Sequence, residues 1–204
     1  AMNVKHIDMQ AYEADDILGT LSKMANEEGI ETYLLTGDRD YFQLVNSQAT
    51  VLYTKKGISE LEKYDMEKIY EKYEVSPLDL IEVKGLMGDK SDNIPGVPGI
   101  GEKTAIKLVK EYKTIDQVYE NLDQVRGKKL KENLENYKMD AFLSRKLGTI
   151  YTDVPIEHTI EDFRLVEPDG EKLFEKFKML EFSSLMKKFQ PETENIKTEY
   201  KAEI

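Results

Sequence analysis

The sequence predicts an α/β fold in which a truncated parallel sheet with covering helices is followed by a mostly helical part. Two observations support this prediction. Short apolar strands alternate with helical patterns over residues 31–54, an order that is typical of parallel sheets. From about residue 65 onward, the apolar residues recur at helical spacing. A chain of 204 residues is also long enough to bury a core of its own.

The first part of the chain combines one long helix with buried strands. Ile17, Leu18, Leu21 and Met24 recur at helical spacing, and Gly29 then supplies a stop signal. The strands are short apolar runs bounded by polar residues or glycine. In order, we expect a short strand over 5–7, a helix over 11–25, a strand over 31–36, a brief helix over 41–45 and a strand over 50–54.

The second part of the chain reads as a succession of helices. Ser76 before Pro77 is typical of a helix start, and Thr114 caps a later helix in the same way. Glycine and proline residues separate the helical patterns. Helices are expected over 66–73, 78–88, 102–112, 115–120, 128–137, 141–150 and 171–180.

The expected sheet is small for its class. About three strands are expected, whereas sheets commonly contain about five or six. We therefore expect part of the sheet to be missing. The predicted organisation is a partial α/β core over 1–64, a helical region over 65–190 and a linker or tail over 191–204.

The composition restricts the classes of site and partner. The chain has no cysteine and only two histidines, so disulfides, thiolate-bound zinc and imidazole-built metal centres are not expected. No apolar run is long enough to span a membrane, and we expect a cytoplasmic protein without a membrane partner. A net charge of −11 opposes nucleic-acid binding unless the charges are unevenly distributed. Basic residues do gather locally, at 103–113 and 126–131, although a solvated helix face is the ordinary explanation of such runs.

Acidic residues form three short clusters, each at an expected junction between two elements. Carboxylates that converge repel one another, and a hard divalent cation such as Mg²⁺ or Mn²⁺ relieves this repulsion through oxygen ligands. The candidate metal ligands and catalytic residues are Glu13, Asp15 and Asp16, then Asp38 and Asp40, then Asp89 and Asp92.

Each cluster taken singly also has a structural explanation. Acidic residues stabilise a helix N-terminus by about 0.3–1 kcal/mol each, and Gly-Asp-x-Asp is a common turn sequence. The three clusters together, followed by the loop described next, favour a metal site instead. Two cations about 3.5–4 Å apart could activate a water and stabilise the leaving oxygen of a phosphodiester.

A loop rich in glycine and proline over residues 93–101 follows the third cluster. Its prolines restrict φ, while its glycines allow positive φ and close approach of the backbone. The amides of residues 99–103 are then expected to face outward at a helix N-terminus, where phosphate binds readily. We interpret the segment as a helix-hairpin-helix motif, which holds duplex DNA through phosphates and does not read bases. An ordinary loop is the alternative, but the order Gly-Ile-Gly-x-Lys-Thr-Ala favours the motif.

These motifs resemble the 5′-nuclease domains of bacterial DNA polymerase I, in the 5′-3′ exonuclease and flap endonuclease family. The resemblance extends over about residues 4–189, and four stretches match in order. They are Tyr-Glu-Ala-Asp-Asp-Ile at 12–17, Thr-Gly-Asp-Arg-Asp at 36–40, Thr-Lys-Lys-Gly-Ile at 54–58 and the run from Gly85 to Gly101. The resemblance implies a nuclease of DNA repair and replication that cuts branched, nicked or 5′-flap duplex DNA with divalent metals.

The resemblance also implies roles for individual residues. Glu13 and Asp15 resemble ligands of a first metal, with Asp16 at or between two sites, and the remaining four aspartates resemble ligands nearer a second metal. In relatives the hairpin also holds K⁺ through backbone carbonyls. The implied DNA-binding residues are Lys55, Lys56, Val97, Gly99, Ile100, Gly101, Lys103, Thr104 and Lys107.

The chain departs from the family pattern before Glu13. Relatives carry further aspartates and a basic helical arch there, and none of these is found in this sequence. The tail over 196–200 resembles the start of the next polymerase domain, which implies polymerase domains as partners in one parent chain. We therefore expect a nuclease portion with impaired activity. A structure-specific DNA-binding module that cannot cut is the first alternative, and an altered free-standing relative is the second.

Overall fold

The computed structural model describes residues 1–56 and 60–189. The predicted tail over 191–204 and its 196–200 segment lie outside the described residues, as do residues 57 and 58 of the 54–58 motif. Contacts divide the chain into two units, each described here by itself. One is Asp8–Glu157, and the other combines Ala1–Ile7 with the described residues from His158 to Phe189.

The sheet of the larger unit has the strand order β1-β2-β3 in the part of the chain that the structure describes. Strands β1 (Thr32–Thr36) and β2 (Ala49–Lys56) are parallel, as predicted. Strand β3 (Glu60–Tyr64) pairs with β2 in the antiparallel direction and was not expected from the sequence. The fold is therefore α/β, as predicted, with a mixed rather than a purely parallel sheet.

The physical reason for missing β3 lies in its composition. Its sequence is Glu-Leu-Glu-Lys-Tyr, and of its side chains only Tyr64 is fully buried. Glutamate and lysine are poor strand formers, so β3 depends on pairing with β2 more than on its own burial pattern. The short strand expected over 5–7 was also wrong, because those residues have no regular structure.

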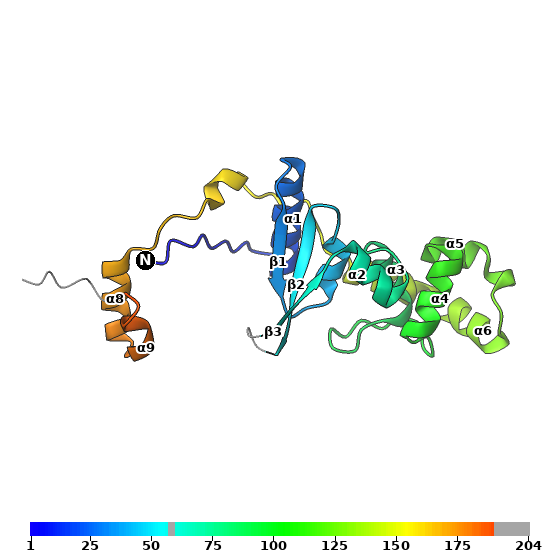
Figure 1. Ribbon diagram of the computed structural model, residues 1–204. Helices are drawn as coiled ribbons and strands as arrows, with labels where there is room; N and C mark the ends of the chain where they lie inside the picture. Colours follow the sequence, from blue (N-terminus) through cyan, green and yellow to red (C-terminus); the bar gives the residue numbers. More distant parts are fainter. Residues whose placement is uncertain (57–59, 190–204) are drawn as a thin grey trace, which may run out of the picture. The chain divides into compact units, whose positions relative to one another are not determined.

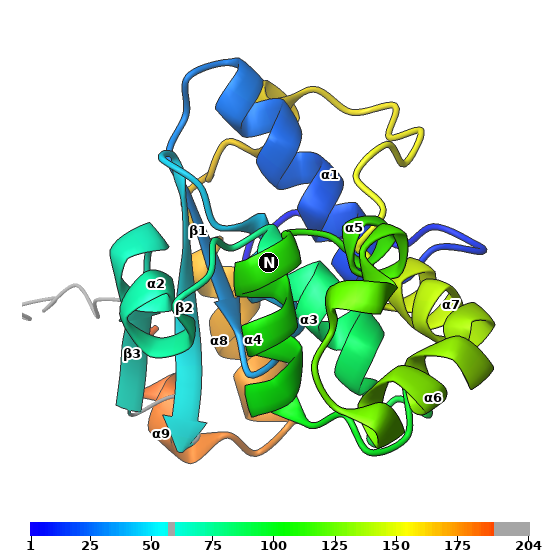
Figure 2. The ribbon, with the colours of Figure 1, turned by 90° about the vertical axis from the view of Figure 1, so that its right-hand side faces the viewer.

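Helix α1 (Ala14–Glu27) lies against the sheet, as Figures 1 and 2 show. Its buried face includes Ile17, Thr20 and Ala25. The helix also closely approaches the segment that follows the last helix of this unit. A Cβ atom on Gly19 would lie 2.8 Å from Cγ2 of Ile150.

The 3-10 helix η1 (Asp40–Leu44) connects β1 to β2 and anchors the core. Phe42 is almost fully buried, and its ring stacks on Tyr64 with centroids 4.3 Å apart. The neighbouring Gln43 is buried as well, and it both donates to the Gly148 carbonyl and accepts from the Ile150 amide, each at 3.0 Å. The acidic loop before η1 is thereby tied to a distant part of the chain.

The rest of the larger unit is helical, as predicted, and α3 is its centre. Helix α3 packs against α4 and α7, and Figure 2 shows these helices grouped to one side of the sheet. A Cβ atom on Gly85 would lie 2.5 Å from Ile115 Cδ1, which shows how closely the helices approach. The helices are α2 (Met66–Tyr73), α3 (Asp79–Met87), α4 (Glu102–Tyr112), α5 (Ile115–Glu120), η2 (Leu122–Gln124), α6 (Lys128–Asn136) and α7 (Lys138–Gly148).

The smaller unit contains η3 (Ile160–Phe163), α8 (Gly170–Met179) and α9 (Ser183–Met186). The N-terminal arm joins this unit, since the Asp169 amide donates to the Ala1 carbonyl at 2.9 Å. Across residues 1–56 and 60–189, the structure has no helix of the length and apolarity that crossing a membrane requires.

Candidate metal centre and adjoining hairpin

Three of the seven candidate carboxylates, all of them aspartates, converge on one lysine, Lys84, in the last turns of α3. Its ammonium forms ion pairs with Oδ2 of Asp40, of Asp92 at 3.1 Å and of Asp89 at 3.3 Å. The Lys84 side chain is only 9% exposed. The second and third acidic clusters, which lie about fifty residues apart in sequence, therefore meet around a single buried positive charge.

Burial and charge act against each other on these groups. Burial raises the pKa of Asp40, and the adjacent ammonium only partly offsets this effect. Burial disfavours the charge on Lys84, but the surrounding carboxylates outweigh it and raise the pKa of the lysine. Burial likewise opposes ionisation of Asp89, yet hydrogen bonds from Ser91 and the charge of Lys84 lower its pKa.

The first acidic cluster is linked to the second through Tyr41. The buried hydroxyl of this tyrosine donates to Oδ1 of Asp15 at 2.7 Å. Burial and then Asp15 raise the pKa of Tyr41, so the phenol stays protonated and acts as the donor. Tyr41 directly follows Asp40 in η1, and the charges of Asp15, Asp16 and Asp38 all act on its hydroxyl, so carboxylates of the first two clusters lie around this residue.

The other two acids of the first cluster also serve the start of α1. Glu13 and Asp16 form a reciprocal capping box, in which each side chain accepts from the other's amide. Asp16 Oδ1 additionally accepts from the Tyr151 amide at 2.9 Å. Helix capping, the structural explanation open at the outset, is thus present alongside any role in metal binding.

Asp38 lies in the exposed loop between β1 and η1. Its Oδ1 accepts from the Asp40 amide at 2.9 Å, and its own amide donates to Oγ1 of Thr36 at 3.0 Å. This local turn fixes the spacing of the two aspartates. Within residues 1–56 and 60–189, Lys84 forms ion pairs with Asp40, Asp89 and Asp92, and Asp38 is not among its partners.

The cation held by this arrangement is an ammonium group. Among the described residues, no group of three or more histidine, aspartate or glutamate side chains is placed to hold a metal ion as it stands. The point where three carboxylate oxygens converge is instead filled by the Lys84 ammonium, which acts as a stand-in cation. An all-oxygen set of this kind matches the preference of Mg²⁺ and Mn²⁺.

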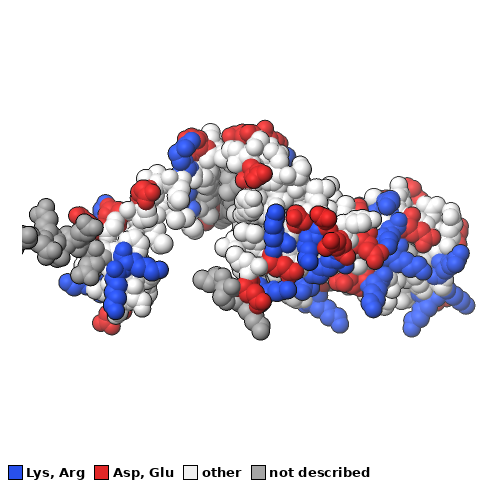
Figure 3. Space-filling view, in the orientation of Figure 1, with Lys and Arg blue, Asp and Glu red and all other residues white. Residues whose placement is uncertain are grey.

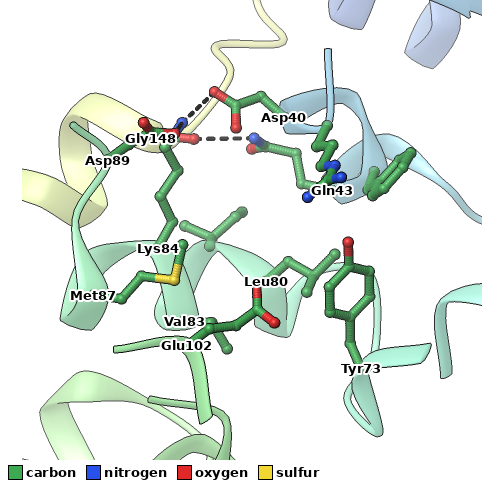
Figure 4. A pocket seen from close by; sticks show the side chains of 13 residues that line it. Asp40, Gln43, Tyr73, Leu80, Val83, Lys84, Met87, Asp89, Glu102 and Gly148 are labelled. Atoms are coloured by element: carbon green, nitrogen blue, oxygen red, sulfur yellow. Dashed lines mark hydrogen bonds and ion pairs between the residues drawn. The ribbon is translucent and has the colours of Figure 1, made fainter. Parts of the chain in front are cut away.

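A cavity of about 170 Å³ opens beside the Asp40–Lys84 pair. Figure 4 shows Lys84 extending toward Asp40 along one side, with Leu80 and Met87 of α3 below it and Tyr73 opposite. Arg39 also lines this space, and its guanidinium lies 6.0 Å from the centroid of the Tyr53 ring. The aspartates thus border a pocket with apolar walls.

Sequence reasoning missed the two side chains that organise the site. Lys84 falls inside the helix expected over 78–88, and Tyr41 begins the brief helix expected over 41–45. Neither was expected to contact an acidic cluster. The signal in the sequence is limited to position, because Lys84 lies just before the third cluster and Tyr41 directly follows Asp40. Neither position shows which carboxylates the side chain contacts. A basic or hydroxyl-bearing residue next to clustered acids is a natural partner for them.

The hairpin between α3 and α4 is held by its backbone. Asp89 and Ile94 form a two-way bridge, with N···O distances of 2.9 and 2.7 Å. Gly88 and Gly96 both have positive φ, and a Cβ atom on Gly96 would lie 2.3 Å from the Gly88 nitrogen. Only glycine can satisfy both conditions at these positions. The two sides of the hairpin are therefore in direct backbone contact, which fixes the shape of the turn.

Side chains from two later helices hold the hairpin in place. Ser144 Oγ of α7 accepts from the Gly96 amide at 2.8 Å, and Ser144 is fully buried. Asn133 of α6 donates to the Pro98 carbonyl at 2.8 Å. The hairpin is consequently attached to the same α3–α7 pair that carries Lys84.

The candidate DNA-binding residues of the hairpin differ in exposure. Val97 and Ile100 are buried in the core, so their side chains are not available to a ligand. The Val97 amide donates to Leu86, and the Ile100 amide to Val97, so these two amides are engaged as well. The exposed or half-exposed candidates are Gly99, Gly101, Lys103, Thr104 and Lys107.

Helix α4 begins at the end of the hairpin. Its first bonded amides are those of Thr104 and Ala105, which both donate to the Gly101 carbonyl at 3.0 Å. The amides of Glu102 and Lys103 precede them and have no carbonyl four residues back within the helix, as at any helix start. Figure 3 shows lysine and arginine side chains projecting from the part of the unit that holds α4 and α6, with acidic side chains gathered beside them.

The remaining DNA-binding candidates, Lys55 and Lys56, lie in β2. Lys55 is exposed and pairs with Glu62 of β3 at 2.9 Å. Its hydrogen bond to Glu62 raises the pKa of the lysine. Lys55 is thus already engaged across the β2–β3 pair.

The sequence of this chain is similar to those of known nucleases and polymerases. Residues 1–74 match the family model of the 5′-3′ exonuclease N-terminal resolvase-like domain. Residues 75–171 match the model of the 5′-3′ exonuclease C-terminal SAM fold. The chain is 45% identical over 190 residues to DNA polymerase I of Bacillus caldotenax, and 45% identical over 188 residues to that of Bacillus subtilis. These alignments cover 93% and 92% of this chain but only 22% and 21% of the relatives, so the chain spans about a fifth of their length.

Solved structures share the fold. A bacteriophage T5 flap endonuclease, in a pseudo-enzyme–product complex with DNA and metal ions, aligns with a TM-score of 0.62 and 25% identity. That alignment covers 72% of this chain and 53% of the phage protein. The catalytic core of Rad2 in complex with DNA substrate aligns with a TM-score of 0.58 and 18% identity, covering 87% of this chain and 60% of Rad2.

Proposed function

This chain belongs to the 5′-3′ exonuclease family, and from that premise we propose that it is the metal-dependent nuclease portion of a DNA repair and replication polymerase. Its substrate is branched, nicked or 5′-flap duplex DNA, and its reaction is phosphodiester hydrolysis. Polymerase domains in the same parent chain are its expected partners, since the similar curated proteins are DNA polymerase I.

One observation carries the proposal. Carboxylates from two segments distant in sequence meet around a single cation, and Tyr41 connects a third segment to them. Helix capping or turn formation alone would not require this convergence. A site that must bind divalent cations does require it, because Mg²⁺ and Mn²⁺ need several oxygen ligands around one point.

We assign the metal-holding role to two groups of side chains. Glu13 and Asp15 would hold a first cation, with Asp16 at or between the two sites, and Asp38, Asp40, Asp89 and Asp92 would hold a second. When bound, the two cations supply an activated water and stabilise the leaving oxygen. The protein's own contribution is to fix these carboxylates, through the turn at Asp38, the Tyr41 hydroxyl and the rigid end of α3.

The hairpin holds the duplex beside this site. At the start of α4 the amides of Glu102 and Lys103 have no acceptor within the helix, and exposed Lys103 and Lys107 add positive charge next to them. Gly99 and Gly101 let the DNA backbone come close, while Val97 and Ile100 support the turn from inside. We also propose K⁺ at backbone carbonyls of the hairpin, in keeping with the family resemblance.

We expect the rate of cleavage by this chain alone to be impaired. Oxygens of Glu13 and Asp16 already serve the capping box, and Asp16 also accepts from the Tyr151 amide. These ligands therefore have less capacity for a first cation than free carboxylates would. A binding module that holds DNA without cutting it is the second candidate function, favoured by the same observation.

The experiment compares binding with cleavage. The chain is incubated with a 5′-flap duplex at low salt, with Mg²⁺, with Mn²⁺ or with EDTA, and analysed by mobility shift and by denaturing gel. We expect a shifted complex and slow, metal-dependent cleavage that Asp38→Ala abolishes. Glu74→Ala is the matched control, because Glu74 pairs with Lys110 away from the acidic clusters. Binding without cleavage by the unaltered chain would favour the binding module, and failure to bind would contradict both functions.

A further inference from the structure

Lys84 is a buried lysine to which the proposed function assigns no role in catalysis or DNA binding. Its side chain is 9% exposed, and its Nζ is shared by Asp40, Asp89 and Asp92. All three are proposed ligands of the second cation. An ammonium group therefore lies where a metal held by these oxygens would be expected.

The position of Lys84 is built into the fold. A Cβ atom on Gly148 of α7 would lie 3.0 Å from Lys84 Cδ and 3.3 Å from Cγ, so the lysine stem passes closely over this glycine. The Gly148 carbonyl is in turn fixed by Gln43, as the dashed line in Figure 4 shows. The stem is guided toward Asp40 by helices α3 and α7 together.

The charges explain why a lysine is placed there. Three carboxylates held this close, partly out of solvent, would repel one another strongly without a cation among them. Lys84 uses Oδ2 of each aspartate, whereas Oδ1 of Asp89 accepts from Ser91. A divalent cation that binds these three convergent oxygens must therefore displace the Lys84 ammonium.

We propose that Lys84 is the internal counter-ion of the metal-free site, and that a divalent cation displaces its ammonium from Asp40, Asp89 and Asp92. This inference rests on the proposed metal site and goes beyond it by assigning a competitor for the ligands. Lys84 is in this sense a positioning residue: it keeps the three aspartates assembled until metal arrives, at the expense of metal affinity.

The first test measures Mn²⁺ binding without DNA. The chain and its Lys84→Met variant are titrated with Mn²⁺ by isothermal calorimetry and by electron paramagnetic resonance of free Mn²⁺. Met keeps the length of the stem but removes the charge. Lys110→Met is the control, because it removes one charge from an ion pair with Glu74 elsewhere. We expect Lys84→Met to lower the dissociation constant about tenfold, and Lys110→Met to change it by less than about twofold.

The same samples are unfolded by heat in EDTA and in saturating Mn²⁺. In EDTA, Lys84→Met should unfold at a lower temperature than the unaltered chain, because the three carboxylates lose their counter-ion. Saturating Mn²⁺ should close or reverse that difference. An unchanged or weaker Mn²⁺ affinity in Lys84→Met, while the unaltered chain binds, would overturn the inference and leave the metal site standing. Absence of binding in every variant would instead overturn the metal site itself.

A second measurement needs no variant and decides the matter if Lys84→Met does not fold. The unaltered chain is acetylated briefly with and without Mg²⁺, and modification of each lysine is followed by mass spectrometry. Displacement predicts that Lys84 becomes several-fold more reactive with Mg²⁺, while Lys110 does not change. Equal or lower reactivity of Lys84 in a sample shown to bind the metal would overturn the inference.

Discussion

The acidic cluster around Lys84 and the hairpin that follows it adjoin along the chain, yet they are held together in opposite ways. The cluster depends on side-chain charges that share one ammonium. The hairpin depends on the backbone bridge between Asp89 and Ile94 and on Gly88 and Gly96, whose backbone atoms are in close contact. The acidic cluster can therefore be rearranged when one cation replaces another. The hairpin cannot change its conformation without losing its backbone contacts.

This difference separates the effects of substitution in the two regions. In the cluster, a change of charge should alter metal binding and catalysis more than folding. In the hairpin, a change of volume should alter folding first, because the contacts are between backbone atoms that cannot move aside. Substitutions in each region, paired with matched controls, test whether the two are as distinct as the structure indicates.

The largest expected effect is on cleavage when Asp40 is changed to Asn. The amide keeps the shape of the side chain but removes a charge from the proposed metal site. We expect cleavage of a 5′-flap duplex with Mg²⁺ to slow about 10³-fold, measured by single-turnover kinetics. Glu74→Gln also removes a carboxylate that pairs with a lysine, Lys110, and should leave the rate unchanged. Equal rates for Asp40→Asn and the unaltered chain would place the chemistry elsewhere.

The next largest effect is on stability when Gly96 is changed to Ala. Gly96 has φ of +60°, and its Cβ atom would lie 2.3 Å from the Gly88 nitrogen. We expect the free energy of unfolding to fall by about 3 kcal/mol in urea titrations, because neither backbone segment can yield without breaking the turn.

Gly101→Ala provides the control for this substitution. Gly101 has φ of −99°, and in the part of the chain that the structure describes no atom beyond its two chain neighbours lies within 4 Å of its Cβ position. The substitution should therefore change the free energy of unfolding by less than about 0.5 kcal/mol. If the two variants were equally stable, the hairpin would be more adaptable than its contacts indicate.

The sequence predicted the parts of this molecule that depend on local signals. The parallel pairing of β1 with β2 was expected from alternation of strand and helix, and it is confirmed. Thr114 was expected to cap a helix, and its Oγ1 accepts from the Gln117 amide at 3.2 Å. These features need only neighbouring residues and a regular apolar pattern.

The features that sequence reasoning missed depend on distant contacts. Strand β3 forms through pairing with β2 and lacks an apolar pattern of its own. Lys84 looks like any lysine in a helix until Asp40, forty-four residues earlier, is brought against it. Tyr41 becomes informative only when α1 places Asp15 within reach of its hydroxyl. The composition of the acidic clusters was therefore predictable, but their neutralising partners were not.

A smaller effect is expected when Tyr41 is changed to Phe. Tyr41 is buried, and its hydroxyl donates to Asp15 at 2.7 Å, so the variant leaves this carboxylate without one donor. We expect a loss of about 1 kcal/mol in the free energy of unfolding and a several-fold slower cleavage. Tyr33→Phe is the control, because Tyr33 is exposed on β1. If both variants matched the unaltered chain in stability and cleavage rate, the hydrogen bond from Tyr41 to Asp15 would contribute to neither.

The smallest effect is expected on the salt dependence of DNA binding when Lys107 is changed to Ala. Each lysine that contacts a phosphate contributes about 0.9 to the slope of log affinity against log salt concentration. Lys107 is exposed on α4, one turn after the hairpin, and we expect its removal to reduce the slope by about one unit in fluorescence anisotropy titrations. Lys110 lies on the same helix but pairs with Glu74, so Lys110→Ala should leave the slope unchanged. Equal slopes for the Lys107→Ala variant and the unaltered chain would mean that DNA is held away from this face of α4. In that case the hairpin would be a structural turn, and the acidic cluster would have to act on DNA held by another surface.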